Sequence, residues 1–170
     1  NGTVFYGRRS TANVGTIWAI NLDGSGDTYI TTGVRPRVTA DGRWLAFLRE
    51  GNPFGSQGNV WLRDLQSGTE SRVLVNLENI TGYDWEPNEA ALLMDYECGI
   101  RDLHTNGIVN AVINSDCYDA APVRNPVDGQ IAFHNLNPDG SIAGLYVASA
   151  NGSGRQRILS SVTGASWPAW

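Results

Sequence analysis

The chain has 170 residues and a mass of 18.4 kDa, which is enough for one ordinary domain and too little for two. Hydrophobic residues make up 41% of it and charged residues 17%, which excludes a disordered chain. The formal net charge of −5 argues against a nucleic-acid partner, because phosphate backbones bind positive surfaces. No apolar run approaches the roughly 20 residues of a membrane span, so we expect no membrane insertion. Because the sequence begins with Asn1 and not Met, we expect a processed protein or a segment of a larger one.

The predicted elements recur in a fixed order along the chain. An apolar run follows a polar turn at Asp41, Asn88 and Asp128, which are about 40 to 47 residues apart. An alternating stretch that ends in a Gly-containing turn is typical of a β-hairpin, and four such stretches cover residues 17–24, 60–68, 100–107 and 145–152. A shorter third run follows each of them, at residues 28–31, 72–75, 108–113 and 155–159. No window holds a helical period over 11 or more residues.

Four such units of four strands each predict an all-β fold, a β-propeller with four four-stranded blades in a single domain over residues 1–170. A small twisted sheet with two apolar faces cannot bury both alone, and stacking the sheets around an axis covers them. The predicted blades cover residues 1–32 plus 164–170, 33–76, 80–114 and 119–161. Trp18 and Trp61 occupy the same strand position, where we expect them to fill the space between blades.

The two ends of the chain predict how the first blade is completed. Residues 1–6 resemble the second half of the turn motif at Asp41-Gly42, and residues 166–170 resemble its first half. We therefore expect the C-terminal strand to close the first blade, which would leave no free sheet edge. Three assemblies remain open. They are a four-bladed ring of one chain, an eight-bladed ring formed by two chains as a homodimer with swapped end strands, and a longer propeller of which the 170 residues are half.

The repeat resembles that of the TolB-type β-propellers over the whole chain. Pro168-Ala169-Trp170 matches the opening of the family motif and Pro126–Gly129 its turn, while Ile17–Gly24 and Val60–Leu65 match its later strand. The third unit departs most, since Asn88-Glu89 replaces Asp-Gly and a very tight turn is expected at Cys98-Gly99. The resemblance implies a periplasmic or cell-surface binding scaffold, a gating domain of a serine peptidase, a sensor module or a lyase.

The residue inventory offers little catalytic chemistry. Only two histidines occur, His104 and His134, and no Gly-x-Ser-x-Gly motif is present, so we expect no enzyme and no catalytic residues. No Cys/His pairs have the spacing of a zinc site, and we expect no metal and no cofactor. Residues 135–140 resemble the start of a calcium loop, but Asn-Pro-Asp-Gly is also an ordinary turn, which we favour.

Cys98 and Cys117 are candidates for a structural disulfide, and two buried thiols are the alternative. A chain with two cysteines and no lysine suits an oxidising compartment, so we expect an extracytoplasmic location, whether periplasmic, cell-surface or secreted.

Without a reaction, the expected site is the concave mouth of the ring. Its walls would be the loops that enter each inner strand and the turns after each second strand. We therefore expect a non-enzymatic scaffold that binds a protein or peptide, with a regulatory or substrate-gating domain of a multidomain enzyme, such as a serine peptidase or sensor kinase, as the alternative. Arg and Tyr are enriched at interface hot spots. The candidate binding residues are Arg8, Arg9, Arg35, Phe54, Tyr83, Asp84, Tyr118 and Asp119.

Overall fold

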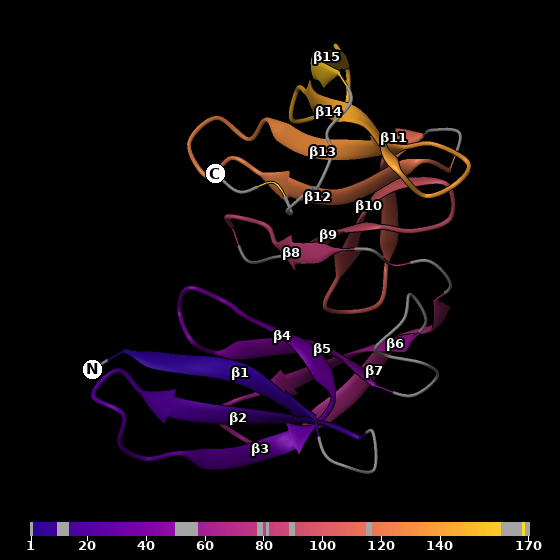
Figure 1. Ribbon diagram of the computed structural model, residues 1–170. Helices are drawn as coiled ribbons and strands as arrows, with labels where there is room; N and C mark the ends of the chain where they lie inside the picture. The colour runs from indigo at the N-terminus through magenta and orange to yellow at the C-terminus, as the bar shows by residue number, and fades with distance from the viewer. Residues whose placement is uncertain are drawn as a thin grey trace. The chain divides into compact units, whose positions relative to one another are not determined.

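The computed structural model describes residues 2–9, 14–49, 58–77, 80, 82–88, 91–114, 117–160 and 168. These residues form β-strands and no helix, which confirms the predicted all-β class. Within them there is accordingly no helix with the length and apolar character needed to cross a membrane. The chain divides into two compact units, Asn1–Glu78 and Asn79–Trp170, and each unit holds two antiparallel sheets (Figure 1).

The first unit contains two sheets whose strands follow one another in chain order. The strands of the first sheet are β1 (Thr3–Arg9), β2 (Gly15–Asn21) and β3 (Thr28–Thr32). The strands of the second sheet are β4 (Val34–Val38), β5 (Trp44–Arg49), β6 (Gly58–Asp64) and β7 (Glu70–Leu77).

The second unit repeats this arrangement with two four-stranded sheets. The third sheet comprises β8 (Tyr83–Trp85), β9 (Ala91–Asp95), β10 (Gly99–His104) and β11 (Val109–Asn114). The fourth sheet comprises β12 (Asp119–Arg124), β13 (Ile131–Leu136), β14 (Ile142–Ala148) and β15 (Gln156–Ser160).

Three of the predicted blades therefore have all four strands, in the meander order that the repeat predicts. The first sheet has three, and its predicted fourth strand, residues 164–170, lies outside the described residues except for Pro168. Strands β4, β8 and β12 are the first strand of their sheets and are called the inner strands here. The strand ends of a sheet form two opposite borders. We call the border at which the inner strand begins the rim edge and the border at which it ends the turn edge, so both names refer to strand ends and not to outermost strands.

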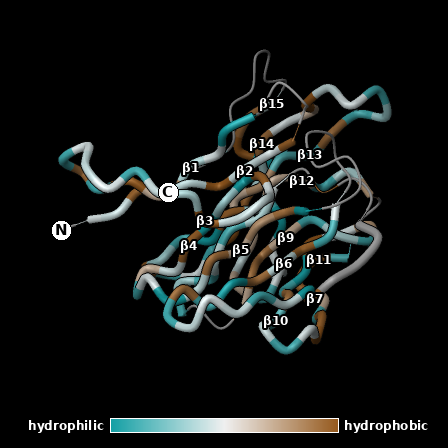
Figure 2. The backbone as a smooth tube through the Cα atoms, turned by 90° about the horizontal axis from the view of Figure 1, so that it is seen from below, coloured by the Kyte–Doolittle hydropathy of each residue, from teal (hydrophilic) through white to brown (hydrophobic). Residues whose placement is uncertain are grey.

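Each unit has an apolar core between its two sheets. In the first unit, Ile17 of β2 packs with Leu45 and Phe47 of β5, and all three are fully buried. In the second unit, Phe133 of β13 packs in one cluster with Leu93 of β9 and other apolar side chains. Strand β9 is buried on both faces. It is also apolar over most of its length, as its colour in Figure 2 indicates. Covering one sheet by the next is the packing expected of neighbouring blades.

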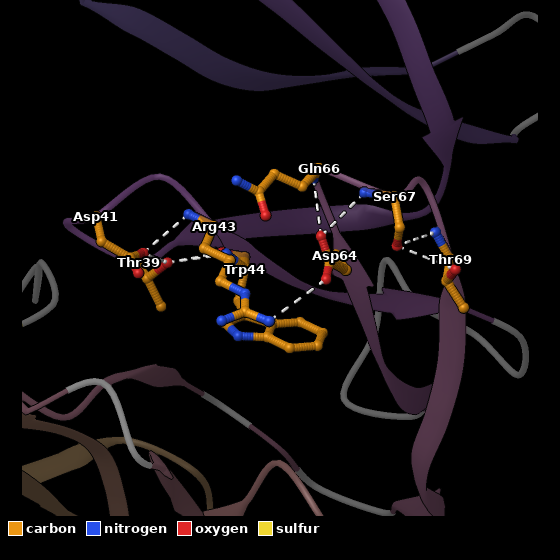
Figure 3. Close-up of polar contacts among 8 residues, drawn as sticks. All are labelled: Thr39, Asp41, Arg43, Trp44, Asp64, Gln66, Ser67 and Thr69. Carbon is orange, nitrogen blue, oxygen red and sulfur yellow. Dashed lines mark hydrogen bonds and ion pairs between the residues drawn. The ribbon is translucent and has the colours of Figure 1, made fainter.

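Side-chain hydrogen bonds at the turn edge explain why the repeat has Asp in its turns. Asp41 accepts from the Arg43 amide at 2.8 Å and from the Thr39 hydroxyl at 2.6 Å, which fixes the turn into β5 (Figure 3). Asp64 accepts from the amides of Gln66 and Ser67 at 2.8 and 3.1 Å, which fixes the turn into β7. Such Asx turns let short polar side chains satisfy backbone donors locally.

Candidate functional site

The rim edge differs from the rest of the backbone because strained residues gather there. Among the described residues, five that are not glycine have a positive φ between 44° and 72°. L-residues pay about 1–2 kcal/mol for this conformation, and such outliers concentrate at functional sites. Arg35 and Ala121 lie within the inner strands β4 and β12, near the end at which each strand begins. Cys117 lies just before β12, and Glu97 and Cys98 lie in the connection from β9 to β10.

Two of these residues occupy the same position in different sheets. In β4, the pairing shifts between Val34 and Arg37, so that Arg35 and Pro36 form a bulge. In β12, the pairing shifts between Ala120 and Val123, so that Ala121 and its following proline form the same bulge. Each bulge places one left-handed residue, with φ of 55° and 51°, directly before a proline. The inner strand is thereby bent at the same point in both sheets.

The predicted disulfide is present and lies at the rim edge of the second unit. It joins Cys98, in the connection from β9 to β10, to Cys117, two residues before β12. The β9–β10 connection is a two-residue turn of Glu97 and Cys98, closed by the Tyr96 amide, which donates to the carbonyl of Gly99 at 2.9 Å. Two left-handed residues are what such a turn requires. The tight turn expected at Cys98-Gly99 therefore lies one residue earlier, at Glu97-Cys98, and Gly99 is the first residue of β10.

Arginine side chains brace the backbone beneath the rim. Arg101 donates to the carbonyl of Ile113 at 2.9 Å and to that of Glu97 at 3.1 Å, which ties the β9–β10 turn to β11. In the first unit, Arg49 donates through Nε to the carbonyl of Thr32 at 2.8 Å, where β3 ends. These bonds and the disulfide tie the connections at the rim to the neighbouring strands.

Asp119 is the most buried of the predicted binding residues, with a side chain that is 0% exposed. Its Oδ1 accepts from Arg155 at 2.9 Å and from Asn135 at 3.0 Å. This buried carboxylate therefore links the start of β12 to Arg155 and Asn135. Tyr118, the preceding residue, is half-buried, and its carbonyl accepts from the Leu136 amide at 2.7 Å.

The other predicted residues of the second unit lie at the start of the neighbouring inner strand. Tyr83 is 5% exposed, and Asp84 is half-buried and accepts from the Trp85 amide at 2.9 Å. The beginnings of β8 and β12 are in close contact, because a Cβ on Gly82 would lie 2.9 Å from the Cα of Ala121. The rim of this unit thus brings together the segments that carry Tyr83, Asp84, Tyr118 and Asp119.

In the first unit, the predicted residues occupy two strands. Arg8 and Arg9 end β1, both exposed, and Arg35 is half-buried in the bulge of β4. Phe54 lies outside the described residues. That these residues and those of the second unit surround one mouth stays a prediction.

The histidines weighed for catalysis and the segment weighed for calcium binding have the following surroundings. His104 lies 2.9 Å through Nε2 from the Asn110 amide nitrogen, and His134 is buried, which lowers the pKa of its ring. Asp139 accepts from the amide and the hydroxyl of Ser141 at 2.8 and 2.6 Å, and these bonds lower its pKa. The segment considered for calcium therefore contains an Asx turn, as its sequence favoured.

The sequence interpretation did not single out two strained residues, Glu97 and Ala121. A signal for the first was available, since the two-residue connection between Tyr96 and Gly99 requires left-handed residues. The Ala121-Pro122 dipeptide gives no such signal, because a residue before proline usually adopts the extended conformation.

No protein-family model and no curated protein sequence matches the chain. Several solved structures, in contrast, are similar to the chain. TolB from Acinetobacter baumannii matches over 93% of this chain and 41% of its own, with a TM-score of 0.75 and 17% identity. A TolB-like protein from Agrobacterium tumefaciens matches over 92% of this chain and 61% of its own, with a TM-score of 0.76 and 14% identity.

The fold is that of the TolB-type β-propellers. The β-propeller domain of the Trilobed protease from Pyrococcus furiosus is also similar, over 94% of this chain and 54% of that one, with a TM-score of 0.63 and 16% identity. This chain thus spans about two-fifths to three-fifths of the length of these three structures. At these identities the likeness establishes the TolB-type fold and no more.

Proposed function

We propose that this chain is a non-enzymatic binding domain that presents its rim edge to a protein or peptide partner. The observation that carries the proposal is the concentration of left-handed residues at the rim, where Arg35 and Ala121 occupy equivalent bulges. Backbone strain persists only where the surrounding structure enforces it, and it is most common at binding and catalytic sites.

The rim carries side chains suited to binding and not to catalysis. Arg35 and Tyr118 are half-buried at the starts of inner strands, and Arg8 and Arg9 are exposed. Arg and Tyr provide much of the energy in protein interfaces. The two histidines lie in different sheets, and among the described residues no three His, Cys, Asp or Glu side chains form a group that could hold a metal ion.

Selection of a displayed peptide library on the purified chain tests this proposal. We expect enriched peptides whose affinity falls at least about tenfold on Arg35→Ala or Tyr118→Ala. Arg43→Ala is the matched control, because Arg43 is exposed at the turn edge of the same sheet as Arg35. A library without binders, or binders that are indifferent to both rim substitutions, would contradict the proposal.

A second candidate is a domain that regulates access to an enzyme encoded in the same polypeptide. The likeness to the propeller domain of the Pyrococcus furiosus protease favours it, together with the fact that this chain covers 54% of that structure. The sequence encoded on either side of these residues distinguishes the two candidates. A peptidase domain there would support gating, and its absence would leave the binding scaffold.

The disulfide supports an extracytoplasmic location as part of the same proposal, because disulfides persist in oxidising compartments. Trapping thiols with a maleimide in intact source cells, before lysis, tests the location. Complete protection of Cys98 and Cys117 is expected, and two reactive thiols would contradict it.

A further inference from the structure

The disulfide of the second unit lies at the surface, although cysteine is among the residue types that are most often buried. Cys98 and Cys117 are both exposed, and both have a left-handed backbone, with φ of 58° and 72°. A thiolate reaches an exposed disulfide without unfolding of the protein, and exposed disulfides are the ones that are reduced most easily. The position of this bond therefore favours exchange with external thiols in the folded chain.

The turn that carries Cys98 has a sequence that does not favour its conformation. Two-residue hairpin turns with two left-handed residues normally contain Asn, Asp or Gly at these positions. Here they are occupied by Glu97 and Cys98, with φ of 44° and 58°. The conformation of the turn therefore depends on bonds to residues outside it, which are the disulfide and the bond that Arg101 donates to the carbonyl of Glu97.

The strands on both sides of this turn are fixed without the disulfide. Strand β9 is buried over its whole length, and Gly99 and Ile100, which begin β10, are buried as well. A Cβ on Gly99 would lie 2.2 Å from the carbonyl oxygen of Ile113, so β10 and β11 are closely packed there. Loss of the disulfide is thus expected to release the turn and to leave the third sheet in place.

The chain that follows Cys117 is also held by bonds of its own. The carbonyl of Tyr118 accepts from the Leu136 amide at 2.7 Å, and Asp119 accepts from the Asn135 side chain at 3.0 Å. Strand β12 begins at Asp119, which is paired with Asn135 of β13. The disulfide therefore connects the start of a fixed strand in the fourth sheet to a turn of the third sheet whose conformation it supports.

We propose that the disulfide between Cys98 and Cys117 is a redox switch of the rim edge, which a dithiol reductant opens while both sheets stay folded. In the oxidised chain, the bond keeps the turn at Glu97 and Cys98 left-handed. In the reduced chain, the turn relaxes. The effect on binding rests on the proposed function, because this turn and Tyr118 belong to the rim that would bind the partner, and reduction is expected to weaken that binding.

The reaction is thiol–disulfide exchange. A thiolate of the dithiol attacks one of the two cysteine sulfurs and forms a mixed disulfide, while the other cysteine leaves as a thiolate. The second thiol of the reductant then attacks the mixed disulfide and releases the first cysteine. Two electrons pass from the dithiol, which becomes a disulfide, to the bond between the cysteines, and the two thiol protons of the reductant end on Cys98 and Cys117.

Reduction of the intact, oxidised chain with dithiothreitol at increasing urea concentrations tests whether the bond opens in the folded state. Maleimide labelling counts the thiols, and far-UV circular dichroism follows the sheets. We expect two thiols per chain, unchanged sheets, and a rate that varies less than about twofold below the unfolding transition, because an exposed bond needs no unfolding. A rate that follows the unfolded fraction, or loss of the sheets on reduction, would overturn the proposal.

Amide exchange, measured by NMR in both redox forms, tests whether reduction releases the turn. The Tyr96 amide closes this turn on the carbonyl of Gly99, and the Gly107 amide closes the β10–β11 turn on that of His104, both at 2.9 Å. We expect exchange at Tyr96 to be at least about tenfold faster in the reduced chain. Exchange at Gly107, the control at the turn edge of the same sheet, should stay unchanged. Equal rates at Tyr96 in the two forms, or an equal increase at Gly107, would overturn the switch.

Peptides selected on the oxidised chain test the effect of reduction on binding. We expect their affinity to fall at least about fivefold when the chain is reduced. The double variant Cys98→Ser/Cys117→Ser is the control for the reductant, because it should bind like the reduced chain with and without dithiothreitol. Peptides that bind both redox forms equally would overturn regulation of the rim. A library without binders would contradict the proposed function alone, and the reduction and exchange measurements would still decide whether the disulfide is a switch.

Discussion

The two edges of the sheets differ in the residues that adopt a left-handed backbone conformation. At the turn edge, left-handed positions between strands are occupied by glycine, as at Gly24, Gly42, Gly68 and Gly107. At the rim edge, Gly33 and Gly140 are accompanied by five left-handed residues with a Cβ, three of them in connections and two in bulges of inner strands. Glycine adopts this conformation without steric penalty, whereas other residues pay about 1–2 kcal/mol.

The difference bears on the binding role proposed for the rim edge. At the turn edge, the connections after Asn21, Val38 and Arg124 combine glycine with Asx turns and are locally relaxed. At the rim edge, the connection from β13 to β14 is built in this way as well, with Asp139 and Gly140. The rim edge keeps strained side chains in place with a disulfide and arginine braces. Strain that is held by additional bonds has a stability cost, which is consistent with a role outside folding.

Removal of the disulfide should have the largest effect on this comparison. The double variant Cys98→Ser/Cys117→Ser opens a loop of about 20 residues, for which we expect a loss of about 3 kcal/mol in the free energy of unfolding. Urea denaturation measures the loss. Hydrogen exchange should quicken at residues 96–99 and stay unchanged in the turn at residues 22–26. Equally faster exchange in both segments would contradict the expectation that the disulfide stabilises the rim edge in particular.

A matched pair of glycine substitutions tests the turn edge. Gly152 has a φ of 78°, and a Cβ there would lie 2.1 Å from the carbonyl oxygen of Val112. Gly24 has a φ of 83° and no atom within 4 Å of such a Cβ. We expect Gly152→Ala to lower the free energy of unfolding by about 2–3 kcal/mol, and Gly24→Ala by about 1 kcal/mol, from backbone strain alone. Thermal and urea unfolding of both variants give the difference, and equal losses would show that close packing at Gly152 is unimportant.

A buried ion cluster at the turn edge predicts a pH dependence. Glu86 follows β8 and contacts Arg124 of β12, which also donates to the carbonyl of Ala150 at 2.9 Å and lies 3.6 Å from Asp102. Burial raises the pKa of Glu86, the Arg124 guanidinium lowers it and Asp102 raises it, and the net pKa is about 7.

The folded chain thus retains a proton on Glu86 at pH values where the unfolded chain has lost it. Stability is therefore expected to fall by about 2 kcal/mol as the pH rises from about 4.5 to 7, and to level off above that. Urea midpoints measured across this range test the slope. In Glu86→Gln, which cannot titrate, the fall should disappear, and an unchanged slope would assign it to other groups.

The sequence predicted those parts of the structure that depend on local chemistry. The Asp-Gly and Asn-Gly turns and the alternating strands indicated sheets of four strands, because each signal lies within a few residues. The pairing of Cys98 with Cys117 was one of two alternatives, and only the folded connection from β9 to β10 decides between them.

Other features depend on contacts between distant residues. The bulges at Arg35 and Ala121 arise from the register of inner strands against β5 and β13, which no local pattern specifies. The same applies to Trp18 and Trp61, which the sequence assigned equally to the space between blades. Trp61 packs against the first unit's core, whereas Trp18 contacts Arg8, whose side chain is 45% exposed.

The smallest expected effect comes from relieving the backbone strain at Ala121. Unlike the other substitutions, this one is not expected to lower the free energy of unfolding. Ala121 has a φ of 51° and a side chain of one carbon, so Ala121→Gly removes the strain and little packing. We expect stability to stay equal or rise by up to about 1 kcal/mol, while Ala120→Gly, at the adjacent buried position, should lower it by about 1 kcal/mol. Paired urea titrations resolve this difference, and a similar loss in both would mean that the rim stores no strain at Ala121. If the strain serves binding, rim-specific peptides should bind Ala121→Gly more weakly than the unmodified chain even though the variant is as stable.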